Sequence, residues 1–171
     1  GFARGYQSRW ANVLGQLSDT VATLSDGSSN DKKNRDIFEE RVEMVLEFWK
    51  DEASRIDGKY YQVPYPFKEG VQGYPAATTA AEAGVDGEVG SDGSIQKVSV
   101  LPKPYTKPHP PCFVAAMKSL ETISFCAKHG FIPTYFMKDE DMAKCFDMYV
   151  EEGQKNGKHY IKGQNQNIVR W

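Results

Sequence analysis

The strongest hydrophobic pattern in the chain lies between residues 35 and 54. Its apolar residues recur at i, i+4, i+7, i+8 and i+11, which is the spacing of one helix face: Phe38, Val42, Val45, Leu46 and Trp49. Charged residues fill most of the other positions. The pattern predicts an amphipathic helix that begins at Arg35.

A second helical pattern covers residues 138–153. Its apolar face carries these residues: Met142, Cys145, Phe146, Tyr149 and Val150. Three acidic residues at 139–141 suit a helix N-terminus, where they complement the helix dipole. The glycines at 153 and 157 favour a helix end in this region.

Short apolar runs predict buried strands. Residues 112–116 are apolar without alternation, which is typical of a strand covered on both faces, and residues 131–135 form a second run. Between them Ser119 is a good N-cap for a helix that ends at Gly130. Its predicted buried residues are Leu120, Ile123, Cys126 and Ala127.

The two ends of the sequence also look like strands. Residues 1–3 resemble the end of a strand and residues 167–171 the beginning of one, so we expect a segment of a longer chain. Helices that alternate with short buried strands are typical of a parallel α/β sheet or barrel.

The remaining stretches show little apolar period. Residues 17–34 are polar and predict a loop, with a short helix as an alternative at residues 17–24. Residues 59–63 predict a strand that pairs with residues 97–101 as a hairpin. Residues 64–94, rich in Gly, Ala, Thr and Pro, predict a long lid-like excursion.

Composition limits the function classes. The chain has 171 residues, a net charge of −2 and a pI near 6.0, which do not favour binding to nucleic acid or to an anionic membrane. No apolar run approaches the ~20 residues that span a bilayer.

The three cysteines predict buried, reduced thiols in a cytoplasmic protein. The three histidines lack metal-ligand spacing, so no metal site is expected.

Three features point to one anion. Arg4 stands beside a glycine after the first strand, Arg35 begins the long helix, and Ser119 opens the helix that follows the 112–116 strand. Neither arginine has a partner in the sequence pattern. Guanidinium groups and helix N-termini both bind phosphate. The alternatives are two solvated surface arginines and an ordinary strand–helix joint.

Several segments, taken in order, resemble the bacterial luciferase-like flavin monooxygenases. The similar segments are residues 1–6 (GFARGY), 35–49 (RDIFEE to Trp49), 57–61 (DGKYY) with 102–111 (PKP to KPHPP), 114–122 (VAA to SLET) and 163–170 (GQNQNIVR). The resemblance implies that residues 1–171 are a single partial domain, the middle to later part of a TIM-type (β/α)8 barrel. Residues 57–108 would be a hairpin and lid-like insertion within it.

The resemblance also implies an oxidoreductase. It would use reduced FMN and O2 to oxygenate a small organic substrate, with a separate flavin reductase and a homo-oligomeric state. The residues that would hold the FMN phosphate are Arg4, Tyr6, Arg35, Ser119 and Thr122. Ala116 and Met117 would lie close to the flavin ring.

The sequence departs from this family in two places. Residues 117–118 lengthen the turn before Ser119, and Leu120 stands where the family often has proline. We assign no catalytic acid or base. A deazaflavin-dependent oxidoreductase on the same barrel and a non-catalytic flavin-binding protein remain alternatives. The piece alone is expected to be inactive and poorly stable, because an open barrel leaves strand edges unpaired.

Overall fold

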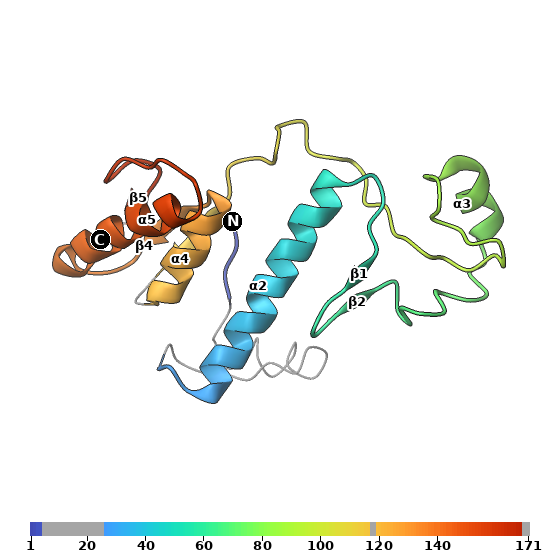
Figure 1. Cartoon of the computed structure of the whole chain (residues 1–171), viewed down its shortest axis with the longest axis horizontal. Coiled ribbons are helices and arrows are strands. Elements are labelled where there is room, and N and C mark those ends of the chain that lie inside the picture. The colour runs from blue at the N-terminus through green and yellow to red at the C-terminus, as the bar shows by residue number, and fades with distance from the viewer. Residues whose placement is uncertain (5–25, 117–118, 169–171) are drawn as a thin grey trace. The chain divides into compact units, whose positions relative to one another are not determined.

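The computed structural model describes residues 1–4, 26–116 and 119–168 (Figure 1). The chain divides into two compact units. The first unit combines Gly1–Asp36 with Pro111–Trp171, and the second unit is Ile37–Pro110. Each unit is described below by itself.

The first unit is built on a parallel sheet with the order β3-β4-β5. Its strands are β3 (Phe113–Ala116), β4 (Ile132–Tyr135) and β5 (Asn167–Ile168). Phe2 adds a parallel bridge to Val114 on the free side of β3. The predicted parallel α/β arrangement and the strands predicted at 112–116 and 131–135 are therefore confirmed, while the strand predicted at 1–3 is reduced to the single bridge at Phe2. The described strands form an open sheet and do not close into a barrel.

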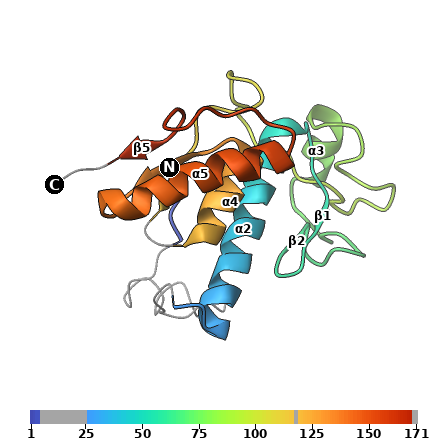
Figure 2. The same ribbon diagram turned by 60° about the vertical axis from the view of Figure 1, so that its left-hand side comes forward.

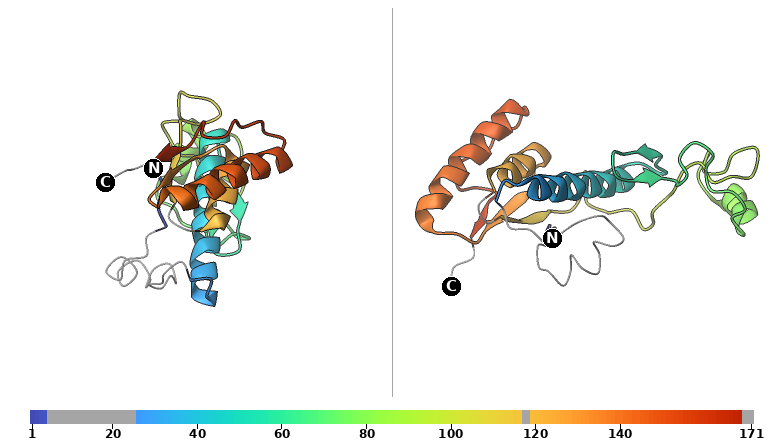
Figure 3. Two further views of the ribbon diagram at one scale, coloured as in Figure 1. Left: turned by 90° about the vertical axis from the view of Figure 1, so that its left-hand side faces the viewer. Right: turned by 90° about the horizontal axis from the view of Figure 1, so that it is seen from below.

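Two helices, α4 (Leu120–His129) and α5 (Asp139–Lys155), pack against each other beside this sheet (Figures 2 and 3). The side chains at the centre of the unit are at most 1% exposed: Ile123, Cys126, Phe131, Tyr135 and Tyr149. Tyr149 donates a hydrogen bond to the carbonyl oxygen of Phe131, 2.9 Å away. The helix stripes predicted from the sequence thus supply the core, and Gly130, with φ of 75°, ends α4 as expected.

Two expectations about this unit were wrong. Strand β3 is not covered on both faces, because Val114 and Ala116 are buried while Phe113 and Ala115 are exposed. Helices lie against only one face of the described sheet, so every second side chain points away from them. Leu120 is 49% exposed. The buried stripe of α4 begins one turn later, at Ile123.

All three cysteines are free and buried, as the sequence predicted. Burial raises the pKa of the Cys112 thiol and of the Cys145 thiol above the usual value. A buried thiol that stays protonated is a poor nucleophile. Neither cysteine is therefore suited to covalent catalysis.

The long helix α2 (Ser29–Lys50) begins six residues before the predicted start. The Ser28 hydroxyl accepts a hydrogen bond from the Asp31 backbone N–H at 3.2 Å, and the Asp31 carboxylate accepts one from the Gly27 N–H at 3.1 Å. The first bond is that of a capping box and the second reaches one residue further back than in the standard motif, and together they start the helix inside the polar stretch. The predicted loop over residues 29–34 is therefore wrong, and Arg35 lies in the second turn of the helix.

The second unit contains the rest of α2 and a short hairpin. Strand β1 (Ile56–Asp57) pairs antiparallel with β2 (Gln62–Val63). The Glu40 carboxylate accepts hydrogen bonds from three successive N–H groups of the turn, those of Lys59, Tyr60 and Tyr61, at 2.8–3.0 Å. The strand predicted over 59–63 is thus confined to its last two residues, because a helix carboxylate holds the earlier ones in a turn.

The predicted pairing of residues 59–63 with 97–101 was also wrong. Val98 forms a bridge with Ser54 instead. Residues 64–94 are not without structure, because they contain α3 (Ala77–Ala83), an alanine-rich and therefore helix-favouring segment. Two further antiparallel bridges join Ile95 to Val71 and to Val89.

None of the described helices has the length and apolar character that a membrane span requires.

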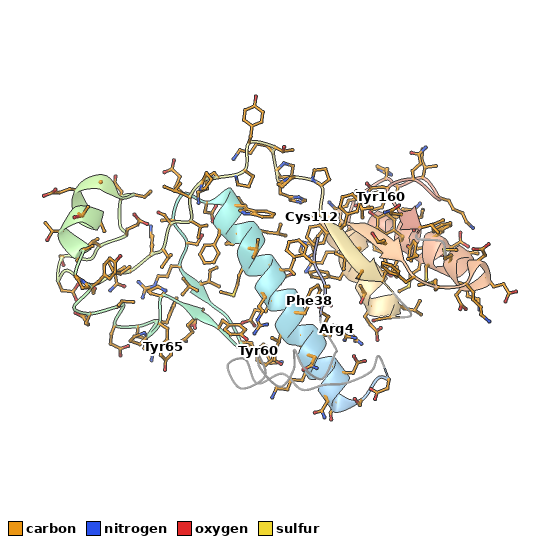
Figure 4. All side chains as sticks on the ribbon, turned by 180° about the vertical axis from the view of Figure 1, so that it is seen from behind. Arg4, Phe38, Tyr60, Tyr65, Cys112 and Tyr160 are labelled. Atoms are coloured by element: carbon orange, nitrogen blue, oxygen red, sulfur yellow. The ribbon has the colours of Figure 1, made fainter. Side chains whose placement is uncertain are left out.

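We predict that Gly153→Ala destabilises the protein although alanine favours helices. A Cβ atom at position 153 would lie 2.2 Å from Cδ2 of Tyr160 (Tyr160 is labelled in Figure 4). The ring is held there by a hydrogen bond from its hydroxyl to the carbonyl oxygen of Ala127, at 3.0 Å. Displacing it should cost about 1–3 kcal/mol of unfolding free energy, measured by urea denaturation.

The background variant Tyr160→Ala provides the control for this prediction. Once the ring is absent, alanine at position 153 should be neutral or stabilising, by up to about 1 kcal/mol. An equal cost in both backgrounds would show that Tyr160 is not the obstacle.

Candidate functional site

The candidate site lies at one edge of the parallel sheet of the first unit. Parallel strands end at the same edge, so the segments that follow Phe2 and Ala116 leave the sheet on the same side. Arg4 comes two residues after Phe2, and Ser119 comes three residues after Ala116. Figure 4 shows Arg4 close to α2.

The centre of the site is a buried carboxylate, that of Asp31, whose side chain is 1% exposed. Arg4 Nη1 lies 2.6 Å from Asp31 Oδ1, and Arg35 Nη2 lies 3.1 Å from Asp31 Oδ2. Both guanidinium groups are also largely buried, with side-chain exposures of 15% and 13%. Asp31 therefore holds two cations from distant parts of the sequence beside each other.

Arg35 connects this pair to helix α4. Its Nη1 atom lies 3.2 Å from Oε1 of Glu121, in the first turn of that helix. The Ser119 hydroxyl donates a hydrogen bond to the other carboxylate oxygen of Glu121, at 3.0 Å. The result is a continuous polar cluster that runs from Arg4 through Asp31, Arg35 and Glu121 to Ser119, called the arginine cluster below.

Among the described residues, the arginine cluster contains two guanidinium groups and two carboxylates. A hydrogen bond from its own backbone N–H lowers the pKa of Glu121, and the Ser119 hydroxyl and the Arg35 charge lower that pKa further. Glu121 is thus an anion near neutral pH. It lies at the helix N-terminus, where an external anion would also bind.

The arginine cluster contains one donor without a partner and one serine that does not cap its helix. The Nε atom of Arg35 is buried and has no hydrogen-bond partner among the described residues. Ser119 has the extended backbone of an N-cap, with φ of −80° and ψ of 110°, but its hydroxyl makes no capping bond to the helix. The prediction that this hydroxyl caps α4 was therefore wrong, because it bonds to Glu121 instead.

The structure brings three of the predicted site residues together, namely Arg4, Arg35 and Ser119. Thr122 lies in the first turn of α4 and is partly exposed, and Ala116 is buried at the end of β3. Tyr6 and Met117 lie outside the described residues. Whether any of these residues binds FMN stays a prediction.

Sequence reasoning missed the two acids of the arginine cluster and therefore treated both arginines as unpaired. For Asp31 a signal was present. Ser28 and Asp31 have the S-x-x-D spacing of a capping box, and Asp31 and Arg35 have the i, i+4 spacing of a helical ion pair. No local pattern joins Arg35 to Glu121, which is 86 positions later by subtraction of their numbers.

Comparisons with known proteins identify similar structures at low sequence identity. No protein-family model matches the chain, and a search of curated proteins finds no match. One similar structure is the oxygenating constituent of 3,6-diketocamphane monooxygenase from Pseudomonas putida, a type II Baeyer-Villiger monooxygenase in complex with FMN. It has a TM-score of 0.57 and 15% identity over 96% of this chain.

A second similar structure is the monooxygenase RslO1 from Streptomyces bottropensis, with a TM-score of 0.55 and 16% identity over 98% of this chain. The chain spans only 36% of the first of these proteins and 47% of the second. At such identities the likeness establishes a shared fold.

We predict that Asp31→Asn lowers the unfolding free energy by about 3 kcal/mol, because it leaves two largely buried guanidinium groups without their common carboxylate. The measurement is urea denaturation. Asp147→Asn is the matched control, since Asp147 pairs with Lys162 at 2.5 Å but both side chains are 55% exposed. An exposed pair contributes at most about 1 kcal/mol, so equal losses in the two variants would contradict the central role of Asp31.

Proposed function

We propose that this chain forms the phosphate-binding part of a flavin-dependent monooxygenase that uses reduced FMN and O2. The observation that carries the proposal is the arginine cluster, in which two arginines and the first turn of α4 meet at one edge of a parallel sheet. The proposal is also supported by similarity of fold to two monooxygenases, one of them in complex with FMN.

The donors of the arginine cluster fit a phosphate group. Arg35 offers a buried Nε that lacks a partner among the described residues, and guanidinium groups form short charge-assisted hydrogen bonds with phosphate. The first turn of α4 adds backbone N–H groups that the Ser119 hydroxyl does not cap, although the Glu121 N–H bonds to its own carboxylate. The carboxylate of Glu121, in its present position, does not fit a site for phosphate, because it is itself an anion and already bonds to Arg35 and Ser119.

The roles of this chain's residues follow from that fit. Arg35 and the start of α4 would bind the phosphate, while Asp31 would orient Arg35 and Arg4. Ala116, Met117 and Tyr6 would lie near the cofactor, as the family resemblance implies. Reduced FMN, when bound, supplies the electrons for the reaction with O2. We assign no proton donor or acceptor for the chemical step.

The larger assembly is also part of the proposal. A parallel sheet with helices on one face is the unit from which a TIM-type (β/α)8 barrel is built, and residues 57–108 would be an insertion within that barrel. The substrate would be a small organic molecule. A separate flavin reductase would supply the reduced FMN. The protein would be homo-oligomeric and cytoplasmic.

Flavin binding and oxygen consumption test this function. The full-length protein should bind FMN with a change in its visible spectrum, and should consume O2 when supplied with reduced FMN. Activity with a reduced deazaflavin in place of reduced FMN would favour the deazaflavin-dependent alternative. Flavin binding without turnover would favour a non-catalytic protein, and no binding of either cofactor would refute the proposal.

We predict that Arg35→Ala weakens FMN binding by about 1.5–3 kcal/mol, the value of a lost charge-assisted hydrogen bond. Riboflavin, which has no phosphate, should bind the variant and the parent protein equally. Arg41→Ala is the control on the same helix, because Arg41 is exposed and its side chain bonds to the Tyr61 hydroxyl. Fluorescence titration gives the affinities, and an unchanged FMN affinity for Arg35→Ala would exclude this role.

A further inference from the structure

We propose that Glu121 is an internal competitor for the anion site, whose carboxylate must leave Arg35 before a phosphate group can bind. This inference rests on the proposed function, since it names the residue that controls access to the same site. Glu121 bonds to Arg35 Nη1 through Oε1 and to the Ser119 hydroxyl through Oε2, at 3.2 and 3.0 Å. A phosphate group held by Arg35 and the start of α4 would compete with the carboxylate for these two donors.

The two carboxylates of the arginine cluster differ in how firmly they are held. Asp31 is 1% exposed and accepts hydrogen bonds from Arg4, Arg35 and the backbone N–H of Gly27. The Glu121 side chain is 58% exposed. Moving Asp31 would remove the carboxylate that two largely buried guanidinium groups share, whereas Glu121 can rotate into solvent at little cost. Asp31 is therefore the fixed acid of the cluster and Glu121 the exchangeable one.

Rotation of Glu121 would change the charge of the site. With Glu121 in place, the described residues of the cluster carry two positive and two negative charges, so a further anion gains little attraction from them. When the Glu121 carboxylate moves away, these residues carry one net positive charge. Arg35 Nη1, the Ser119 hydroxyl and the Glu121 backbone N–H then lose their bonds to the carboxylate, and Arg35 Nε already has no partner among the described residues.

This exchange favours anions that carry more charge and more acceptor atoms than a carboxylate. A phosphate monoester carries about −1.5 to −2 charges near pH 7 and three acceptor oxygens. It can therefore replace both bonds of Glu121 and use the remaining donors. A monovalent ion such as chloride cannot replace both bonds, so Glu121 keeps Arg35 paired and oriented in the absence of the flavin.

The test compares Glu121→Gln with Glu140→Gln in the full-length protein. Glutamine keeps the size of the side chain and removes its charge. Glu140 has the equivalent position in the first turn of α5, so its replacement gives the same loss of charge at a helix N-terminus. The ligands are FMN, inorganic phosphate and riboflavin, and calorimetric or fluorescence titration measures their affinities.

We expect Glu121→Gln to bind FMN and inorganic phosphate about tenfold more tightly than the parent protein, with riboflavin affinity unchanged. Glu140→Gln should change none of these affinities. If the parent protein binds FMN but Glu121→Gln binds it no more tightly, the competitor role is wrong and the proposed function stands. If neither protein binds FMN or phosphate, both proposals are wrong.

Thermal denaturation in the absence of ligand separates a binding effect from a folding effect. Both glutamine variants should lose a small amount of stability, since each removes one helix-dipole interaction, and Glu121→Gln should lose slightly more because it also removes the ion pair with Arg35. A tighter FMN affinity in Glu121→Gln together with equally tighter riboflavin binding would show a general change in the site. That result would also overturn the competitor role.

Discussion

The arginine cluster depends on the pairing of one buried carboxylate with two guanidinium groups. Asp31 is 1% exposed and lies within hydrogen-bond distance of Arg4 and Arg35. Burying a carboxylate costs several kcal/mol of hydration free energy, which such partners must offset. The two arginines in turn depend on Asp31, because their guanidinium groups are largely buried and share its carboxylate. This mutual requirement holds the start of α2 beside the chain segment that follows Phe2.

The same pairing explains how two like charges can lie beside each other in the first unit. Two adjacent cations repel each other, and a carboxylate between them removes most of that repulsion. Asp31 does so from the buried side, and Glu121, which is 58% exposed, pairs with Arg35 as well. Arg35 thus has one buried counter-ion and one largely exposed counter-ion.

Much of the first unit could be predicted from the sequence, because its elements are encoded locally. The stripes of α4 and α5 repeat at helical spacing, Gly130 ends α4, and the short apolar runs form β3 and β4. The start of α2 was missed because its polar composition outweighed the capping signal of Ser28 and Asp31. The hairpin β1–β2 was missed because Glu40, from a helix, holds the turn.

The candidate site was predicted in part. Arg4, Arg35 and Ser119 were chosen by residue type and position, and the structure brings them together. Their acidic partners could not be chosen in this way, since the contact between Arg35 and Glu121 exists only after α4 has packed in place. Sequence patterns report neighbours along a helix face, whereas this contact joins two helices.

The anchoring of Tyr160 has a consequence for how the chain can vary in evolution. Its ring fills the space beside Gly153, and its hydroxyl bonds to Ala127. Five residues later the Asn165 amide donates to the Tyr149 hydroxyl at 2.8 Å. Residues 161–164, between these two fixed points, are exposed. Insertions and deletions among relatives should therefore collect in residues 161–164, while Tyr160 keeps its spacing to Gly153 and Asn165 keeps its spacing to β5.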